Sequence, residues 1–262
     1  MRVRKLNQDR PWTFLVGAGV LKPILIPLAS RTWIDGEKIP ATGGCIVAVN
    51  HISHLDPLTM AHFVYDHGRI PRYLAKSGLF KNRVVGGFLR SAGQIPVERL
   101  SRNAIGAYDA AVDAVNDGEC VVIYPEGTLT RDPALWPMTG KSGAARIALA
   151  TGCPVIPVGQ WGAQDILPPY ARTPDLFPRK HITMKVGDPV ALDDLLALRV
   201  TRETVHQTTE RIMAAITEIV AELRGEPAPT TRFDQSSSGG QQIGNPKGRH
   251  NSRTGSRKRR LR

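Results

Sequence analysis

Short apolar runs that alternate with longer helical patterns constrain the fold of this chain more than any other feature. Six runs rich in β-branched and other apolar residues predict strands, at 45–50, 72–75, 94–97, 120–124, 155–160 and 182–186. Helical patterns follow or separate these runs, at 58–65, 102–116, 141–151 and 201–223. Such alternation is typical of an α/β domain with a largely parallel or mixed sheet flanked by helices.

The pattern at 102–116 shows how a helix is predicted. Its apolar residues recur at spacings of three and four, which places them on one face: Ile105, Tyr108, Val112 and Val115. Ser101 precedes the pattern as a candidate N-cap, and Gly118 follows it as a stop signal. The pattern at 201–223 has the same spacing of apolar residues. No internal repeat is visible in the sequence.

The net charge of +12 is concentrated at the two ends of the chain. Residues 225–262 hold nine Lys or Arg against Glu226 and Asp234, which gives +7 and leaves +5 for the rest. This stretch is rich in Pro, Gly and Ser and lacks apolar periodicity, so we expect a disordered basic tail. The first ten residues are also basic, and both ends favour an anionic surface, either phospholipid or nucleic acid.

An apolar segment at 12–28 resembles a membrane span, but Lys22, Pro23 and Pro27 interrupt it. A spanning helix needs about 20 predominantly apolar residues, and no A-x-A pattern marks a signal-peptide cleavage site. We expect a helix or a broken helix pair lying in the membrane interface; the alternative is a helix packed on the domain's own core. The predicted organisation is an interfacial segment at 1–30, a catalytic domain at 31–224 and the tail at 225–262.

The densest polar cluster is NHISHLDP at 50–57, directly after an apolar strand. Side chains at the carboxyl end of a strand in an α/β sheet commonly project into the ligand crevice. On a regular helix, His51 and Asp56 would lie roughly 140° apart and would not meet. With His51 in the turn and Asp56 at the helix start, they can meet, and an imidazole oriented by a carboxylate is a general base.

Simpler interpretations of the same residues remain open. Asp56 before Pro57 fits an N-cap followed by proline at the first helical position. His51 and His54 could each be a core or surface histidine. A metal-dependent hydrolase could use His51, His54, Asp56 and His62, but HxH and HExxH spacings are missing, so we expect no metal.

The three cysteines, Cys45, Cys120 and Cys153, form no CxxC pair, and each lies at the edge of an apolar run. We interpret them as small buried hydrophobic residues in a reducing compartment. A catalytic thiol is the less favoured alternative, because none has a histidine partner close in sequence.

Four sequence blocks together resemble the glycerolipid acyltransferase family. His51 and Asp56 match its HxxxxD pattern, and GQIPVER at 93–99 is similar to its second block, whose arginine, here Arg99, binds substrate phosphate. YPEGTLTRD at 124–132 resembles the third block through Glu126, Gly127 and Thr128, and CPVIPVG at 153–159 resembles the fourth through Pro157. The resemblance runs from about 33 to 187 and is greatest to the 1-acylglycerol-3-phosphate acyltransferases.

This sequence departs from the family pattern at one position. The third block of the family usually reads EGTR, and Leu129 stands here at the arginine position. Arg131 and Lys141 are the candidates for the missing cation. Lys141 opens the predicted helix GKSGAARIALA, where free amides and the helix dipole favour a phosphate; the alternative is a solvated lysine at a helix end.

The resemblance implies the glycerol-3-phosphate acyltransferase fold and transfer of a fatty acyl chain from a thioester to a hydroxyl. The donor would be acyl-CoA or acyl-carrier protein, with no further cofactor. The acceptor would be 1-acyl-sn-glycerol 3-phosphate or a related glycerol phosphate, giving phosphatidic acid in phospholipid biosynthesis; another lysolipid or a glycolipid is the alternative. One general base suffices for this chemistry, and no GxSxG motif supplies a nucleophilic serine.

A lipid acceptor would place the protein at the cytoplasmic face of the membrane, as a peripheral or monotopic protein. Each Lys or Arg near an anionic bilayer contributes about 1 kcal/mol, so the tail carries enough charge for attachment; it could also be only a solvated end. We do not expect nucleic acid as a partner, because no RNP, KH or helix-turn-helix signature accompanies the basic cluster.

Overall fold

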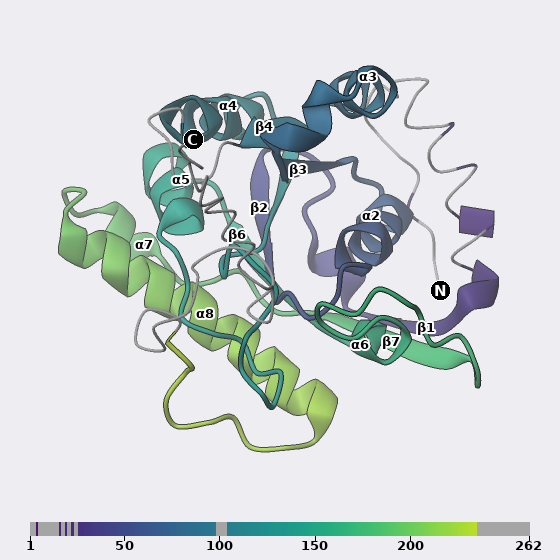
Figure 1. The fold of residues 1–262 in the computed structure, drawn as a ribbon. Coiled ribbons are helices and arrows are strands. Elements are labelled where there is room, and N and C mark those ends of the chain that lie inside the picture. Colours follow the sequence, from purple (N-terminus) through teal and green to yellow (C-terminus); the bar gives the residue numbers. More distant parts are fainter. Residues whose placement is uncertain are drawn as a thin grey trace, which may run out of the picture.

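The computed structural model describes residues 4, 16, 19, 22–23, 26–97 and 104–234. A seven-stranded sheet forms the middle layer, in the order β1-β7-β6-β2-β5-β3-β4 (Figure 1). Its strands are β1 Ala29–Ile34, β2 Cys45–Val49, β3 Pro71–Lys76, β4 Ile95–Val97, β5 Cys120–Ile123, β6 Val155–Trp161 and β7 Lys180–Val186. Neighbouring strands are parallel except β6 and β7, which are antiparallel. The predicted α/β class with a largely parallel or mixed sheet is therefore confirmed.

Helices cover both faces of this sheet (Figure 1). They are α2 Asp56–Asp66, α3 Arg83–Ser91, α4 Ala104–Asn116, α5 Gly143–Thr151, α6 Ala163–Ile166, α7 Asp193–Leu196 and α8 Arg202–Arg224, with 3-10 turns η1 Gly36–Lys38 and η2 Ser77–Lys81. The long helix α8 has clear sequence signals at both ends. Thr201 forms a capping box with Thr204, and Gly225 ends the helix at φ 63°.

Strand β2 joins two hydrophobic cores, which explains its uninterrupted apolar sequence. Its residues Ile46 and Ala48 pack in the core that includes α4, α5 and α8. Cys45, Val47 and Val49 alternate with them and pack in the core that includes α2. A parallel strand buried on both faces is apolar throughout, whereas a strand with one solvated face alternates. The three cysteines are free and buried, as predicted.

The two ends of the predicted domain differ from expectation. Strand β1 begins at Ala29, two residues before the predicted boundary, and most of segment 1–30 lies outside the described residues. In the part of the chain that is described, no helix is both long and apolar enough to cross a membrane. Residues 225–234 return to the domain, where the Thr139 N–H donates to the Phe233 carbonyl at 3.0 Å. The predicted tail boundary is therefore about ten residues early, and 235–262 lie outside the description.

Candidate active site

The loops that follow β2 and β5 lie at the same edge of the sheet. These two strands are parallel neighbours, with Ala48 opposite Ile123 in the register. The polar cluster that begins at Asn50 therefore emerges beside the loop that begins at Tyr124. This is the carboxyl edge of the parallel strands, where α/β proteins place their ligand sites.

His51 and Asp56 meet within the first of these loops. Nδ1 of His51 lies 2.8 Å from Oδ2 of Asp56, so the contact predicted from the turn is confirmed. The main-chain N–H groups of Ile52 and Ser53 donate to the same Oδ2, at 2.7 and 2.8 Å. The carboxylate is fully buried, so three donors on one oxygen hold it in a single orientation toward the imidazole.

The N-cap interpretation of Asp56 is wrong. Asp56 is the first residue of α2, and Leu55 occupies the N-cap position without a side-chain capping bond. The Asp56 carboxylate accepts from Ile52 and Ser53, which precede it, instead of from amides of the first helical turn. Its position therefore serves the loop and His51.

Tyr124, which the sequence interpretation did not select, packs on the His51 ring. The two rings stack with centroids 4.2 Å apart and an interplanar angle of 28°. With Nδ1 directed at Asp56, the other ring nitrogen, Nε2, is the one that can exchange a proton with a substrate. The His51 side chain is 15% exposed, so part of it can be reached by a ligand. The only sequence signal for Tyr124 was its place directly before the PEGT block.

Glu126 holds the main chain of His51. Its Oε1 accepts from the His51 N–H at 2.9 Å, and its Oε2 accepts from the Met138 N–H at 3.0 Å. The Thr130 N–H donates in turn to the His51 carbonyl at 2.7 Å. Burial raises the pKa of Glu126 to about 8. These buried contacts hold the His51 loop in position. Glu126 was also predicted to bind substrate, and that role stays a prediction.

The backbone conformation at position 127 favours glycine. Its φ of +70° lies in the left-handed region, which residues other than glycine rarely adopt. A Cβ there would also lie 2.9 Å from Cδ and 3.0 Å from Nζ of Lys141. The Lys141 side chain therefore lies over the turn of the third block. Thr128, the next residue of that turn, is buried.

The structure separates the two candidates for the missing cation. Leu129 is buried at 2% exposure, so the family's arginine position points into the protein here. Arg131 is half-buried, and its main-chain N–H lies 3.1 Å from Sδ of Met138. Lys141, by contrast, lies over Gly127, and its N–H donates to the Pro125 carbonyl at 2.8 Å. Helix α5 begins at Gly143 after the N-cap Ser142, so Lys141 precedes the helix that it was predicted to open.

The described contacts do not bring Pro157 to this loop pair. Pro157 lies inside β6, opposite Ala48 of β2, and its carbonyl accepts from the Gly187 N–H at 2.9 Å. These contacts give Pro157 a place in the sheet, and its role with substrate stays a prediction. Arg99 lies outside the described residues.

A reciprocal pair of amide side chains fastens the end of β2 to the end of β6. Asn50 Nδ2 donates to the Gln160 carbonyl at 3.0 Å, and the Gln160 N–H donates to Asn50 Oδ1 at 2.9 Å. Gln160 Nε2 donates to the Asn50 carbonyl at 2.7 Å. Both residues are fully buried, so the base of the His51 loop is fixed. Gln160 was not selected from the sequence, because it is simply the last residue of a predicted apolar strand.

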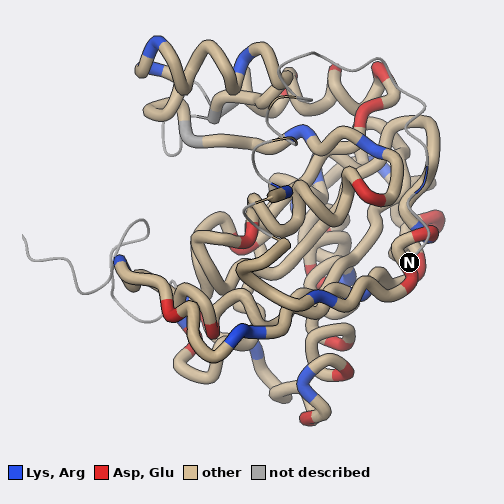
Figure 2. Tube along the Cα trace, turned by 90° about the vertical axis from the view of Figure 1, so that its right-hand side faces the viewer, with Lys and Arg blue, Asp and Glu red and all other residues tan. Residues whose placement is uncertain are grey.

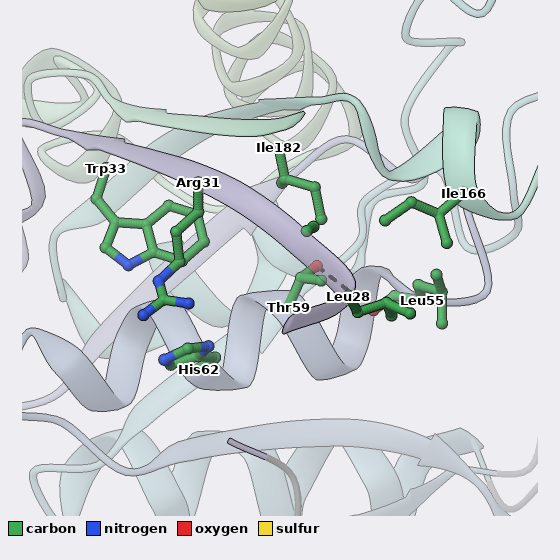
Figure 3. Close-up of a pocket in the computed structure, with 9 residues that line it drawn as sticks. Leu28, Arg31, Trp33, Leu55, Thr59, His62, Ile166 and Ile182 are labelled. Carbon is green, nitrogen blue, oxygen red and sulfur yellow. Dashed lines mark hydrogen bonds between the residues drawn. The ribbon is translucent and has the colours of Figure 1, made fainter. Parts of the chain in front are cut away.

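A small pocket, partly open to solvent, lies between β1 and α2 (Figure 3). Leu55, which directly precedes Asp56, lines one end together with Ile166 and Leu28 (Figure 3). The remaining lining residues are Ala29, Arg31, Trp33, Thr59, His62 and Ile182. His62 is paired with Asp66 at 3.2 Å, and His, Cys, Asp and Glu in the described ranges form no group suited to a metal.

This geometry can be compared with known proteins. A model of the family described as "Acyltransferase" matches residues 31–161, which is half of the chain. The chain belongs to this acyltransferase family. The matched range contains His51, Asp56 and the loop of Glu126, so the contacts among these residues lie within the part that the family model covers.

Among the relatives of this acyltransferase, the 1-acyl-sn-glycerol-3-phosphate acyltransferase of Bacillus subtilis is 26% identical over 77% of this chain and 94% of its own length. The chloroplastic protein BAT2 of Brassica napus, of the same description, is 32% identical over 53% of this chain. The match spans only 39% of that relative, which is much longer. The crystal structure of the acyltransferase PlsC from Thermotoga maritima has the same fold, with a TM-score of 0.62, 22% identity and 86% of each chain covered.

Proposed function

We propose that this acyltransferase moves a fatty acyl chain from a thioester to the free hydroxyl of 1-acyl-sn-glycerol 3-phosphate, giving phosphatidic acid for phospholipid biosynthesis. The observation that carries the proposal is the pairing of His51 with the buried Asp56 at 2.8 Å, which leaves Nε2 for the acceptor hydroxyl. The relatives in Bacillus subtilis and Brassica napus are named 1-acyl-sn-glycerol-3-phosphate acyltransferases, which supports this choice of acceptor.

The proposed chemistry needs one proton relay. An alcohol has a pKa of roughly 15.7, like that of water, so His51 Nε2 takes the hydroxyl proton while the oxygen attacks the thioester carbonyl. The new C–O bond forms, the C–S bond breaks, and the proton returns to the departing thiolate. That leaving group has a pKa of about 8.5 as a free thiol and departs without a strong acid. Asp56 stabilises the imidazolium that exists between the two transfers.

Two cations would hold the acceptor phosphate in this proposal. Arg99 matches the family's phosphate-binding arginine in sequence. Lys141 lies over the turn at Gly127, beside the loop that holds His51. A phosphate fixed by these residues would turn a bimolecular attack into a positioned one.

The pocket beyond Leu55 is our candidate for the acyl chain. Most of its lining is apolar and comes from β1, α6, β7 and the residues that precede β1 and α2, while α2 itself contributes the polar Thr59 and His62. Apolar walls favour a hydrocarbon chain. The acyl donor would be acyl-CoA or acyl-carrier protein, and no other cofactor enters the chemistry. Because a lysolipid resides in a bilayer, we further propose that the enzyme works as a peripheral or monotopic protein at the cytoplasmic face.

An acceptor panel tests the proposal. Purified full-length protein is given radiolabelled palmitoyl-CoA with lysophosphatidate, glycerol 3-phosphate, lysophosphatidylcholine or a monoacylated glycolipid. We expect lysophosphatidate to have the highest kcat/KM. A higher value for another lysolipid or for the glycolipid would replace the acceptor but keep the acyl transfer. No transfer to any acceptor, from either CoA or carrier-protein donors, would reject the function itself.

A further inference from the structure

Helix α3 and the preceding turn η2 expose apolar side chains that a soluble domain would normally bury. Val84 is 81% exposed, Leu79 50%, Val85 45% and Phe88 39%. In α3 only Gly86 is buried. A surface helix normally turns its apolar stripe to the core, so the polarity of α3 is inverted. We call this region the α3 surface: Leu79, Val84, Val85 and Phe88 with the neighbouring cations Lys81, Arg83 and Arg90.

Specific contacts fix α3 in this inverted orientation. A Cβ at Gly86 would lie 2.3 Å from the Phe80 carbonyl oxygen, so the α3 backbone rests directly on η2. Arg90 Nη1 donates to the same carbonyl at 3.1 Å. Asn82 caps the helix, since its Oδ1 accepts from the amides of residues 84 and 85 at 3.0 Å. The glycine face therefore packs inward and the valines point outward.

The charge on this surface has one sign. Residues 67–97 contain no Asp or Glu, and Lys81, Arg83 and Arg90 border the exposed apolar side chains. In Figure 2 the segment from η2 through α3 carries blue and no red. Apolar side chains bordered by cations complement an anionic lipid surface. A second copy of the chain is a poorer partner, because a two-fold interface would bring the same cations together.

The α3 surface lies at the edge of the sheet that carries the active site. Strands β3, β5 and β2 are parallel, so their carboxyl ends point the same way. Tyr73 lies opposite Val122 in the register, which places Ser77, at the start of η2, level with the loop that follows Tyr124. Figure 1 shows η2 and α3 at the rim of the domain, beyond β3 and β4.

We propose that the α3 surface docks on an anionic phospholipid bilayer, with its apolar side chains among the lipid chains and its cations on the phosphates. Docking there would bring the His51 edge of the sheet toward the bilayer. The residues of this surface are distinct in sequence from the basic N-terminus and tail. Its binding to lipid requires no substrate, so it can be tested independently of the proposed acyl transfer.

A site-specific probe tests the contact directly. The three native cysteines are buried, so Val84→Cys in the full chain offers one exposed thiol for an environment-sensitive fluorophore. Val200→Cys, at a position 57% exposed between α7 and α8, is the matched control. Vesicles of equal parts phosphatidylglycerol and phosphatidylcholine, without lysolipid, are then added. We expect a several-fold emission rise and quenching by nitroxide lipids at position 84, and little change at position 200.

Paired variants separate the apolar and electrostatic contributions. Val84→Ser/Val85→Ser should weaken vesicle binding about tenfold at any ionic strength, because apolar burial is lost. Lys81→Gln/Arg83→Gln should weaken it about tenfold or more at low salt and little at high salt, because added salt already screens these charges. Leu198→Ser/Val200→Ser, which removes equally exposed apolar groups elsewhere, should bind like the wild type.

Several results would overturn the proposal. One is a silent probe at position 84 while the protein sediments with vesicles; another is wild-type affinity in both surface variants. A probe that responds to an acidic carrier protein but not to vesicles would assign the surface to that protein. Self-association that the serine variant abolishes, without a change in vesicle binding, would assign it to a second copy.

Discussion

The main-chain N–H of His51 donates to Oε1 of Glu126 at 2.9 Å, and this bond ties the loop after β2 to the loop after β5. Asp56 orients the imidazole from one side, and Tyr124 supports its face. The backbone, the ring nitrogen and the ring face of His51 thus have separate partners. A base held this way is already oriented when the acceptor arrives, so little orientational entropy remains to be lost in the reaction.

His51→Ala should abolish acyl transfer without unfolding the protein. We expect a loss of at least about 100-fold in kcat, the scale of a missing general base. Circular dichroism and thermal unfolding check the fold, and a labelled acyl-CoA assay measures the rate. His54→Ala is the matched control, because His54 is exposed three residues away and should keep most activity. Wild-type turnover in His51→Ala would contradict general-base catalysis by His51.

Asp56→Asn keeps the shape of the side chain and removes its charge. The amide oxygen can still accept from Ile52 and Ser53, so we expect the loop to persist. Its NH2 would replace Oδ1, which is buried and has no hydrogen-bond partner among the described residues, at a cost of about 1–3 kcal/mol in stability. We expect kcat to fall at least about 100-fold, since nothing then stabilises the imidazolium. Full activity would show that the carboxylate serves only the fold.

Glu126 should make stability depend on pH in a defined window. An ordinary glutamate ionises near 4.5, and burial raises the pKa of Glu126 in the folded protein to about 8. Between these values the folded chain binds one more proton than the unfolded chain, so this contribution to stability is complete below pH 4.5 and is lost as pH rises toward 8.

The Glu126→Gln variant isolates that contribution. Glutamine cannot ionise, so the unfolding free energy of the wild type relative to that of the variant should fall steadily as pH rises from about 4.5 to about 8. At low pH the variant should be about 1–3 kcal/mol less stable. Its NH2 group cannot accept a hydrogen bond, so one of the two main-chain N–H groups, of His51 or Met138, loses its partner. Urea unfolding at several pH values measures both effects, with the exposed Glu218→Gln as control. A pH-independent difference would contradict the raised pKa.

Lys141 should contribute more to acceptor binding than Arg131. Lys141→Ala is expected to raise the acceptor KM about tenfold, the scale of one lost charge-assisted contact, while Arg131→Ala changes it less. Arg99→Ala, predicted from sequence, should raise the same KM. Initial rates at varied lysophosphatidate measure these effects. A raised donor KM with an unchanged acceptor KM would assign the cation to the donor instead.

The contact between His51 and Asp56 could be predicted because it is local, since both residues lie in one turn. Strands β2 and β5 were also predictable, because burial on both faces makes their sequences continuously apolar. The contacts of His51 with Tyr124 and Glu126 depend on the pairing of β2 with β5, across more than 70 residues, which no local pattern reveals.

Two of the longer elements, strand β1 and helix α3, were not predicted from the sequence. Strand β1, with the sequence ASRTWI, is partly exposed at the sheet edge and reads as polar, so nothing marked it as a strand. Helix α3 was missed because its apolar residues face outward and Gly86 and Gly87 interrupt its pattern. Periodicity detects burial, so an element that buries little leaves little trace.

Removing the chain after Asp234 tests the basic tail without disturbing the domain. A cut at 224 would also remove residues 225–234, which contact the domain through Phe233 and through an ion pair between Arg232 and Glu210. Residues 235–262 contain eight Lys or Arg and no Asp or Glu, so their loss lowers the net charge from +12 to +4. We expect weaker binding to anionic vesicles, which the addition of salt reproduces in the wild type.

Catalysis should be largely spared by this truncation. The described contacts of the site join residues within 50–160. We therefore expect kcat on a short-chain, water-soluble acceptor to stay within about twofold of the wild type, since the tail would act only through screened surface charge. Vesicle co-sedimentation across a salt series and the soluble-acceptor assay are run on the same preparation. Unchanged co-sedimentation at low salt would leave the tail with no membrane role, and attachment would then rest on the α3 surface and the N-terminal segment.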